Sequence, residues 1–204
     1  MRKNATPEAV RVLAAANKPD LRPLLLTQSE VAKIDPKFGE RWIYDERVLP
    51  VWTSNSLLPD PKAVEAFGRV MGYQTMMVKA LFQDESAPTI SAGLLQQVTV
   101  YRDPNNAQKI LDNMEGLGRG LWLSPPRVGD SARAWTATLA IEGDTSRNAS
   151  FTEIDFRVEG YIASVRVQTM PILISQSLIA GDSNKEIALK LAEALTVKLK
   201  AIKK

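Results

Sequence analysis

Cysteine and histidine are both absent from the 204-residue chain. Without cysteine there is no disulfide, no thiol nucleophile and no thiolate metal ligand, so cysteine usage says nothing about the compartment. Without histidine, the usual catalytic base and the commonest zinc ligand are also missing. The common serine, cysteine and metal-dependent hydrolases are therefore excluded, and any catalysis would need carboxylate, lysine, tyrosine or cofactor chemistry. We expect no catalytic residues, no metal site and no cofactor.

Long apolar runs are missing too. None approaches the ~18 residues of a membrane span, and the N-terminus lacks the apolar core of a signal peptide, although a leader removed upstream of Met1 would leave the same sequence. The net charge is +3, and the lysines at 198, 200, 203 and 204 alone exceed that excess. Because the helix dipole favours lysine in a last helical turn, these residues predict a solvated helix end and no nucleic-acid partner.

What the sequence does contain is a hairpin that can be aligned residue by residue. Residues 150–158 alternate between apolar and polar, and Glu159-Gly160 follows as a two-residue turn, with the glycine expected to supply the positive φ. The predicted cross-strand pairs are Val158 with Tyr161, Phe156 with Ala163, Ile154 with Val165, Thr152 with Val167 and Glu153 with Arg166. One face is apolar, so the sequence predicts a half-buried antiparallel ribbon.

The opposite face of this ribbon carries Glu153, Asp155 and Arg157. Two carboxylates on one strand face suggest an acid–base pair. With Arg157 and Arg166 nearby, however, the pattern favours a charge ladder on a wet surface.

The remaining elements follow from capping signals and apolar spacing. We expect helices at 6–17, 27–35, 60–72, 103–116 and 183–202, edge strand or irregular structure at 40–58, strands at 73–82 and 94–101, and a three-strand unit from 129 to 170. This order predicts an α+β fold with an antiparallel sheet of about five strands covered by helices. Residues 1–23 would form an N-terminal helical arm or extension, and residues 24–204 a single domain.

Three motifs invite a functional interpretation. The glycines at 116–120 resemble a phosphate loop, but they follow a helix instead of preceding one, which favours a simple loop. The oxygens of Asp182, Asn184 and Glu186 suggest calcium, but Ser183 with Glu186 fits a capping box better. Trp135 is expected in the interior. In the loop at 116–126, Arg119 and Trp122 are the candidate binding residues.

Residues 127–132 (Arg-Val-Gly-Asp-Ser-Ala) and 156–165 (Phe-Arg-Val-Glu-Gly-Tyr-Ile-Ala-Ser-Val) resemble motifs of a class of bacterial extracytoplasmic domains. Residues 25–31 and 101–107 resemble the helix entry and the strand-to-helix step of the same class. Such domains occur in surface lipoproteins and in the sensor portions of membrane kinases, with an α+β sandwich similar to the PsbP-like fold. The resemblance spans about residues 24–200. It implies an exported, membrane-associated protein without catalytic residues.

Three functional hypotheses remain open. The first is a non-catalytic extracytoplasmic accessory domain of a cell-envelope or membrane complex, which binds a protein partner or a small ligand. The second is an enzyme that uses carboxylate or lysine chemistry in a cleft near Trp122 and Arg119. The third is a structural subunit docked by its N-terminal arm.

Overall fold

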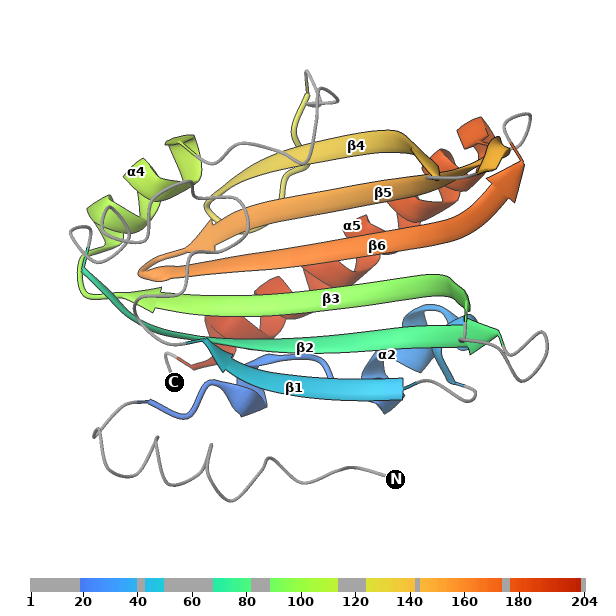
Figure 1. Cartoon of the computed structure of the whole chain (residues 1–204). Helices are drawn as coiled ribbons and strands as arrows, with labels where there is room; N and C mark the ends of the chain where they lie inside the picture. The colour runs from blue at the N-terminus through green and yellow to red at the C-terminus, as the bar shows by residue number, and fades with distance from the viewer. Residues whose placement is uncertain are drawn as a thin grey trace.

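A computed structural model describes residues 19–39, 43–49, 68–81, 89–113, 124–141, 144–173 and 177–202. Its centre is one antiparallel sheet with the strand order β1-β2-β3-β6-β5-β4 (Figure 1). The strands are β1 (Ile43–Leu49), β2 (Arg69–Leu81), β3 (Thr89–Tyr101), β4 (Ser131–Ile141), β5 (Asp144–Val158) and β6 (Tyr161–Leu173). The predicted α+β class is confirmed, and the described residues form six strands where about five were expected.

The additional strand is β1 at the edge of the sheet. Among the described strands it pairs with β2 alone, from Ile43 opposite Val78 to Leu49 opposite Gly72. The sequence predicted edge strand or irregular structure for this region, because Pro50 cannot donate a ladder hydrogen bond. The edge-strand reading is confirmed for residues 43–49.

The β5–β6 register agrees with the sequence prediction at every pair, from Val158 opposite Tyr161 to Thr152 opposite Val167. The backbone of the turn differs. The positive φ of 53° belongs to Glu159 and not to Gly160. Gly160 is needed for another reason, because a Cβ there would lie 3.1 Å from the carbonyl oxygen of Tyr101. The N–H of the same residue, Tyr101, donates to Gly160 O at 2.8 Å. This hydrogen bond holds the turn against the end of β3.

The turn is also held from the other side by the segment just before β4. Asp130 N donates to Arg157 O at 2.7 Å, and Asp130 Oδ2 accepts from Glu159 N at 2.7 Å. Gly129 has a φ of 64°, and a Cβ on it would lie 2.3 Å from Arg157 O. Residues 128–130 therefore act as a clamp on the hairpin, which explains physically why Val-Gly-Asp stands there.

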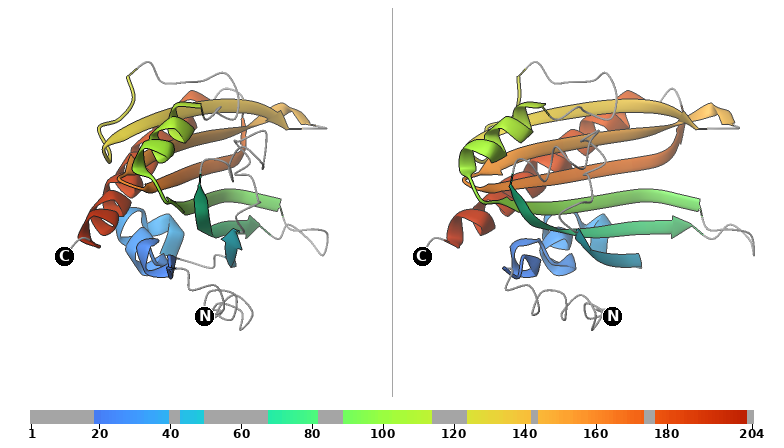
Figure 2. Two further views of the ribbon diagram at one scale, coloured as in Figure 1. Left: turned by 90° about the vertical axis from the view of Figure 1, so that its left-hand side faces the viewer. Right: turned by 60° about the vertical axis from the view of Figure 1, so that its left-hand side comes forward.

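Two helices cover one face of the sheet. Helix α5 (Ser177–Ala201) runs diagonally behind β5, β6 and β3, and α2 (Gln28–Ile34) lies beside it behind β2 (Figures 1 and 2). Of the apolar residues at helical spacing on this helix, Leu191 and Leu195 are fully buried and Leu199 nearly so, whereas Ile202, just past its end, is 45% exposed. Two 3-10 helices, η1 (Arg22–Leu24) and η2 (Pro36–Gly39), flank α2. We call this the covered face, and the opposite side the open face.

The segment that leads into α2 is anchored by a buried amide. Gln96 Nε2 donates to Leu26 O, and Gln96 Oε1 accepts from Leu26 N, each at 3.1 Å. Gln96 is fully buried, so both of its polar groups need such partners. Leu21, which immediately precedes η1, is 1% exposed and belongs to the main hydrophobic core. The predicted helix at 6–17 lies outside the described residues, and the division at residue 23 stays a prediction.

The smaller helices follow their capping signals. Thr27 and Glu30 form the predicted capping box of α2. Helix α4 (Pro104–Asn113) begins after Asp103, whose Oδ1 accepts from Asn105 N at 2.8 Å. As the spacing predicts, Ala107, Ile110 and Leu111 are buried on its inner side.

Two predicted boundaries were wrong. Helix α5 begins at Ser177, so Ser183 and Glu186 lie inside it and form no capping box. Asn184 instead docks the helix on the sheet, donating to Ser150 O at 3.2 Å and accepting from Thr169 Oγ1 at 2.9 Å.

The second error concerns Val70 and Met71, which were expected at the end of a helix closed by Gly72. All three lie in β2. The left-handed residue that precedes the strand is Gly68, with a φ of 74°. Val70 and Met71 continue the helical spacing of the apolar residues before them, which is why the pattern predicted a helix there. Residues 60–67 of that predicted helix lie outside the described residues.

The clamp predicts that Gly129→Ala destabilises the fold by more than about 2 kcal/mol, because a left-handed backbone strain is added to a backbone clash. Gly68→Ala is the matched control: it has a similar φ, but the nearest atom to its new Cβ is 3.8 Å away. We expect this variant to lose only about 1 kcal/mol. Urea unfolding of both variants measures the difference, and equal losses would contradict the clamp.

A buried polar cluster on the open face

The open face carries a group of polar side chains from four neighbouring strands. The cross-strand pairs Glu153–Arg166 and Asp155–Ser164 join β5 to β6, while Arg133 on β4 lies opposite Asp155. Gln97 on β3 lies opposite Ser164. Because side chains alternate along a strand, all of these residues point away from α5. We call them the polar cluster: Gln97, Arg133, Glu153, Asp155, Ser164 and Arg166.

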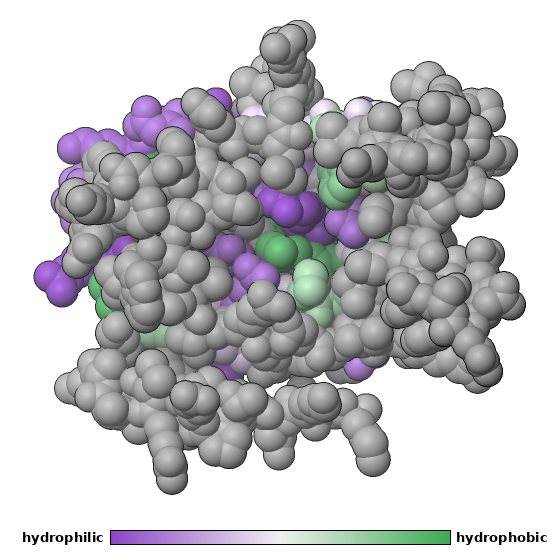
Figure 3. Space-filling view, viewed as in Figure 1, coloured by the Kyte–Doolittle hydropathy of each residue, from purple (hydrophilic) through white to green (hydrophobic). Residues whose placement is uncertain are grey.

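The polar cluster is buried. Glu153 is 2% exposed and Asp155 is fully buried. The prediction of a charge ladder on a wet surface was therefore wrong about the environment, although the pairing of Glu153 with Arg166 is confirmed. Strand alternation shows which side chains share a face, but it does not show whether that face is covered. In Figure 3, hydrophilic and hydrophobic residues are visible next to each other in the middle of the open face.

Glu153 and Arg166 form a buried ion pair. Arg166 Nε donates to Glu153 Oε2 at 3.0 Å, and the Arg166 side chain is 17% exposed. Burial raises the pKa of Glu153 above its usual range, and the nearby guanidinium of Arg166 opposes that shift. The pair compensates for the burial of the charge rather than adding stability of its own.

Asp155 has a different environment. Its Oδ1 accepts a hydrogen bond from the Ser164 hydroxyl, while Oδ2 has no hydrogen-bond partner among the described residues. Burial raises the pKa of Asp155 well above its ordinary value, and the negative charge of Glu153 adds to the rise. The Ser164 hydroxyl, Arg166 and Arg133 oppose this shift. A carboxyl in such a place holds its proton to higher pH and presents an acid O–H.

Arg133 connects the polar cluster to α4. Its Nη1 donates to Leu111 O at 3.3 Å and to Asp112 O at 2.5 Å, near the C-terminal end of the helix. A cation is favourable at this end of a helix, where carbonyl groups lack intrahelical partners. The guanidinium also lies 5.3 Å from the ring centroid of Trp135.

Trp135 belongs to a second apolar cluster beneath α4, so its predicted interior position is confirmed. At 5% exposure it packs in a group with Tyr101, Ala107, Ile110, Leu111 and Ile162. Burial raises the pKa of Tyr101 to about 12, and the charge of Arg69 opposes that rise. This apolar cluster holds α4 over one end of the open face, beside the polar cluster.

Only some of the sites predicted from the sequence lie within the described residues. Arg119 and Trp122, as well as the glycines at 116–120, lie outside the described residues, so a binding role for that loop stays a prediction. At the rejected calcium motif, Asp182 pairs with Lys185 at 3.1 Å and Glu186 with Lys190 at 2.6 Å. Within the ranges that the structure describes, no group of three acidic side chains is placed to hold a metal ion.

No family model matches the chain, and no curated protein does. Several solved structures resemble it, among them two from Mycobacterium tuberculosis. One is the extracellular domain of PknH from Mycobacterium tuberculosis, with a TM-score of 0.33, 12% identity, and coverage of 82% of this chain and 92% of that one. The other is LpqN, involved in cell envelope biogenesis of Mycobacterium tuberculosis, with a TM-score of 0.33, 14% identity, and coverage of 72% and 81%.

These similarities are distant, and they assign neither a family nor an activity to this chain. Their printed descriptions concern an extracellular domain and a cell-envelope protein. The PsbP-like description stays a prediction. None of the helices in the described ranges has the length and apolar character that crossing a membrane requires.

The raised pKa of Asp155 predicts a pH dependence of stability. Because its folded-state pKa lies above the ordinary value of 3.8, its stabilising contribution is complete below that value and is lost as pH rises through the folded-state pKa. We expect the free energy of unfolding of Asp155→Asn to fall less than that of the wild type over this range. Urea unfolding at a series of pH values above 3.8 measures it.

Asp182→Asn is the matched control, because the Asp182 side chain is 77% exposed. Its stability should follow the wild type across the same pH series. If Asp155→Asn also followed the wild type, the buried acid would not be protonated in the folded state.

Removing the partner of Glu153 should be costly. We expect Arg166→Met to lower the free energy of unfolding by about 3–5 kcal/mol, because a buried carboxylate loses its counter-ion. Lys190→Met removes one partner of an exposed pair, with side chains 52% and 69% exposed, and should cost no more than about 1 kcal/mol. Thermal unfolding of the two variants measures the difference. If Arg166→Met and Lys190→Met lost similar free energies of unfolding, the Glu153–Arg166 pair would be exposed to solvent and not buried.

Proposed function

We propose that this chain is a non-catalytic accessory domain of a bacterial envelope or membrane complex, acting outside the cytoplasm. It binds a protein partner or a small ligand through the open face of its sheet. The observation that carries the binding part is Asp155, a fully buried carboxyl with one oxygen unpartnered among the described residues.

A buried polar atom without a hydrogen bond costs roughly 1–3 kcal/mol. The hydroxyls of Thr75, Tyr101 and Ser150 are also unpartnered among the described residues, and Asp155 is the carboxyl in this group. Because Asp155 is fully buried, a partner reaches its Oδ2 only when the groups that cover it move aside. In its acid form, the carboxyl then offers an O–H to an acceptor oxygen of that partner. Arg133 and Arg166 bring positive charge to the same group of strands. The matching partner group is therefore a carbonyl, carboxylate or hydroxyl oxygen.

The same chemistry supports binding over catalysis. The hydroxyl next to Asp155 belongs to Ser164, which already donates to Oδ1. A carboxyl that keeps its proton is no base with which to activate a serine nucleophile. The chain has no histidine or cysteine to take that role instead.

The extracytoplasmic part of the proposal is supported by the sequence resemblance at residues 127–132 and 156–165. In the structure these residues form the clamp and its hairpin. Membrane association through a removed leader belongs to this proposal as well. Docking through residues 1–23 belongs to the alternative of a purely structural subunit.

An enzyme is the second candidate, because a raised carboxyl pKa suits a general acid. Asp155→Asn separates the two functions. The variant has no acidic proton, so an enzyme would lose turnover, whereas a binding domain would keep its ligand through the amide N–H. Binding and turnover of any molecule retained by the wild type are the two quantities to compare.

The binding proposal is tested with the double variant Asp155→Leu/Ser164→Ala. Replacing both members of a buried polar pair by apolar groups is close to neutral or stabilising. We therefore expect an unfolding temperature equal to or above that of the wild type, together with loss of binding. Native mass spectrometry after incubation with a bacterial envelope extract detects the bound molecule or protein.

Asp182→Leu is the control, and it should bind as the wild type does. Retention of the same molecule by the double variant would overturn the proposal. The proposal would also be overturned if the wild type bound nothing from the extract and the double variant failed to fold. The polar cluster would then have a structural role.

A further inference from the structure

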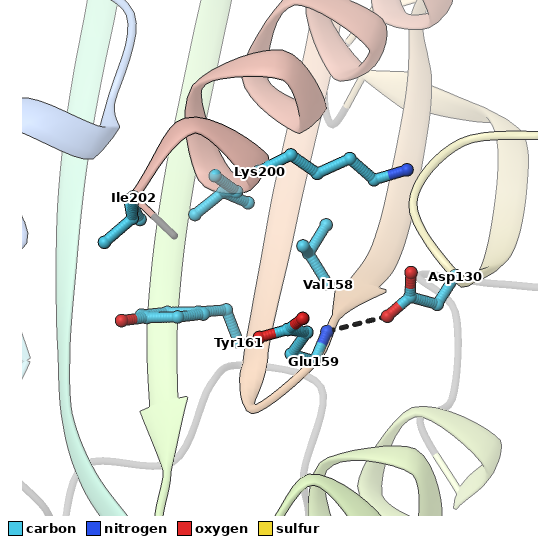
Figure 4. Close-up of a pocket in the computed structure, with 7 residues that line it drawn as sticks. Asp130, Val158, Glu159, Tyr161, Lys200 and Ile202 are labelled. Atoms are coloured by element: carbon cyan, nitrogen blue, oxygen red, sulfur yellow. Dashed lines mark hydrogen bonds between the residues drawn. The ribbon is translucent and has the colours of Figure 1, made fainter. Parts of the chain in front are cut away.

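A pocket of about 400 Å³ lies where the C-terminal end of α5 passes the β5–β6 turn (Figure 4). Its size falls in the range of small-molecule sites, about 300–1,000 Å³. The clamp, the hairpin and the helix each contribute side chains, including Asp130, Glu159, Tyr161, Leu199, Lys200 and Ile202. It is separate from the polar cluster, because it adjoins α5 while the polar cluster points to the open face.

Two opposite charges, those of Asp130 and Lys200, line this pocket and do not pair with each other. Asp130 Oδ2 accepts from Glu159 N at 2.7 Å and lies 3.6 Å from Arg157 Nη1, but Oδ1 has no partner among the described residues. The Lys200 ammonium likewise has no hydrogen bond or ion pair within the described part of the chain. Figure 4 shows the Lys200 side chain extending along the rim toward the side where Asp130 lies.

The opposite side of the pocket is apolar. The ring of Tyr161 and the side chain of Ile202 lie there (Figure 4), and the buried Leu199 also lines the pocket. Ile202 is 45% exposed and, with Val197, is one of two large apolar side chains exposed in the described ranges. An apolar group placed against Tyr161 and Ile202 would remove this surface from water.

We propose that the pocket binds an amphipathic zwitterion, namely a free amino acid with an apolar or aromatic side chain. Its ammonium group lies on Asp130, its carboxylate on Lys200, and its side chain against Tyr161, Leu199 and Ile202. Asp130 and Glu159 would repel a simple anion, and Lys200 would repel a simple cation. A zwitterion satisfies both charges and covers the apolar wall.

The test is an NMR titration of the folded chain with L-phenylalanine, followed at the backbone amides of Glu159, Tyr161 and Lys200. We expect saturable shifts at these amides. Lys200→Gln should weaken binding roughly tenfold, because it removes the charge that pairs with the carboxylate. Lys190→Gln changes an exposed lysine elsewhere on α5 and should leave binding unchanged.

Two analogues test the two charges separately. Phenethylamine lacks the carboxylate and N-acetyl-L-phenylalanine lacks the ammonium, and each should bind roughly tenfold more weakly than L-phenylalanine. Absence of saturable shifts up to about 10 mM would overturn the proposal. Equal binding of phenethylamine, or of Lys200→Gln, would also overturn it, since no zwitterion would then be recognised.

Discussion

The register of the β5–β6 hairpin is the constraint on which the rest of this structure depends. The clamp holds the turn from one side through Asp130, and the end of β3 holds it from the other through Gly160. A slip of one residue would move Phe156 and Ile154 to the open face and Asp155 under α5. The hydrophobic core, the seat of α5 and the composition of the polar cluster therefore all follow from this pairing.

The two faces of the sheet have different roles. On the covered face, apolar side chains from the strands meet α5, and the buried amides of Gln96 and Asn184 are satisfied by hydrogen bonds, whereas the hydroxyls of Thr75 and Ser150 have no partner among the described residues. On the open face, Asp155 is as buried as the core but keeps an oxygen unpartnered among the described residues. Asp155 is the carboxyl among the unpartnered buried groups, and the binding proposal therefore rests on it.

How much the sequence could predict depended on the range of the interaction. The hairpin pairs and the Thr27–Glu30 capping box are local, and both were correct. The burial of Glu153 and Asp155 depends on parts of the chain far away in sequence, so alternation alone assigned them to water. The capping pattern at Ser183 failed because the helix continues upstream of it, with Asn184 used for docking. The available sequence signal for the polar cluster was the predicted hairpin register, which sets Glu153 and Asp155 opposite Arg166 and Ser164 on the neighbouring strand.

The central claim is that Asp155 is a buried acid whose pKa lies well above its ordinary value. Its side-chain carboxyl carbon, assigned by comparison with Asp155→Asn, can be followed by NMR through a pH titration of the folded chain. This account predicts that the Asp155 signal keeps its protonated position well above the ordinary value of 3.8. A signal that titrates near 3.8 would mean that the carboxyl is solvated, and it would contradict both the buried cluster and the binding role built on it.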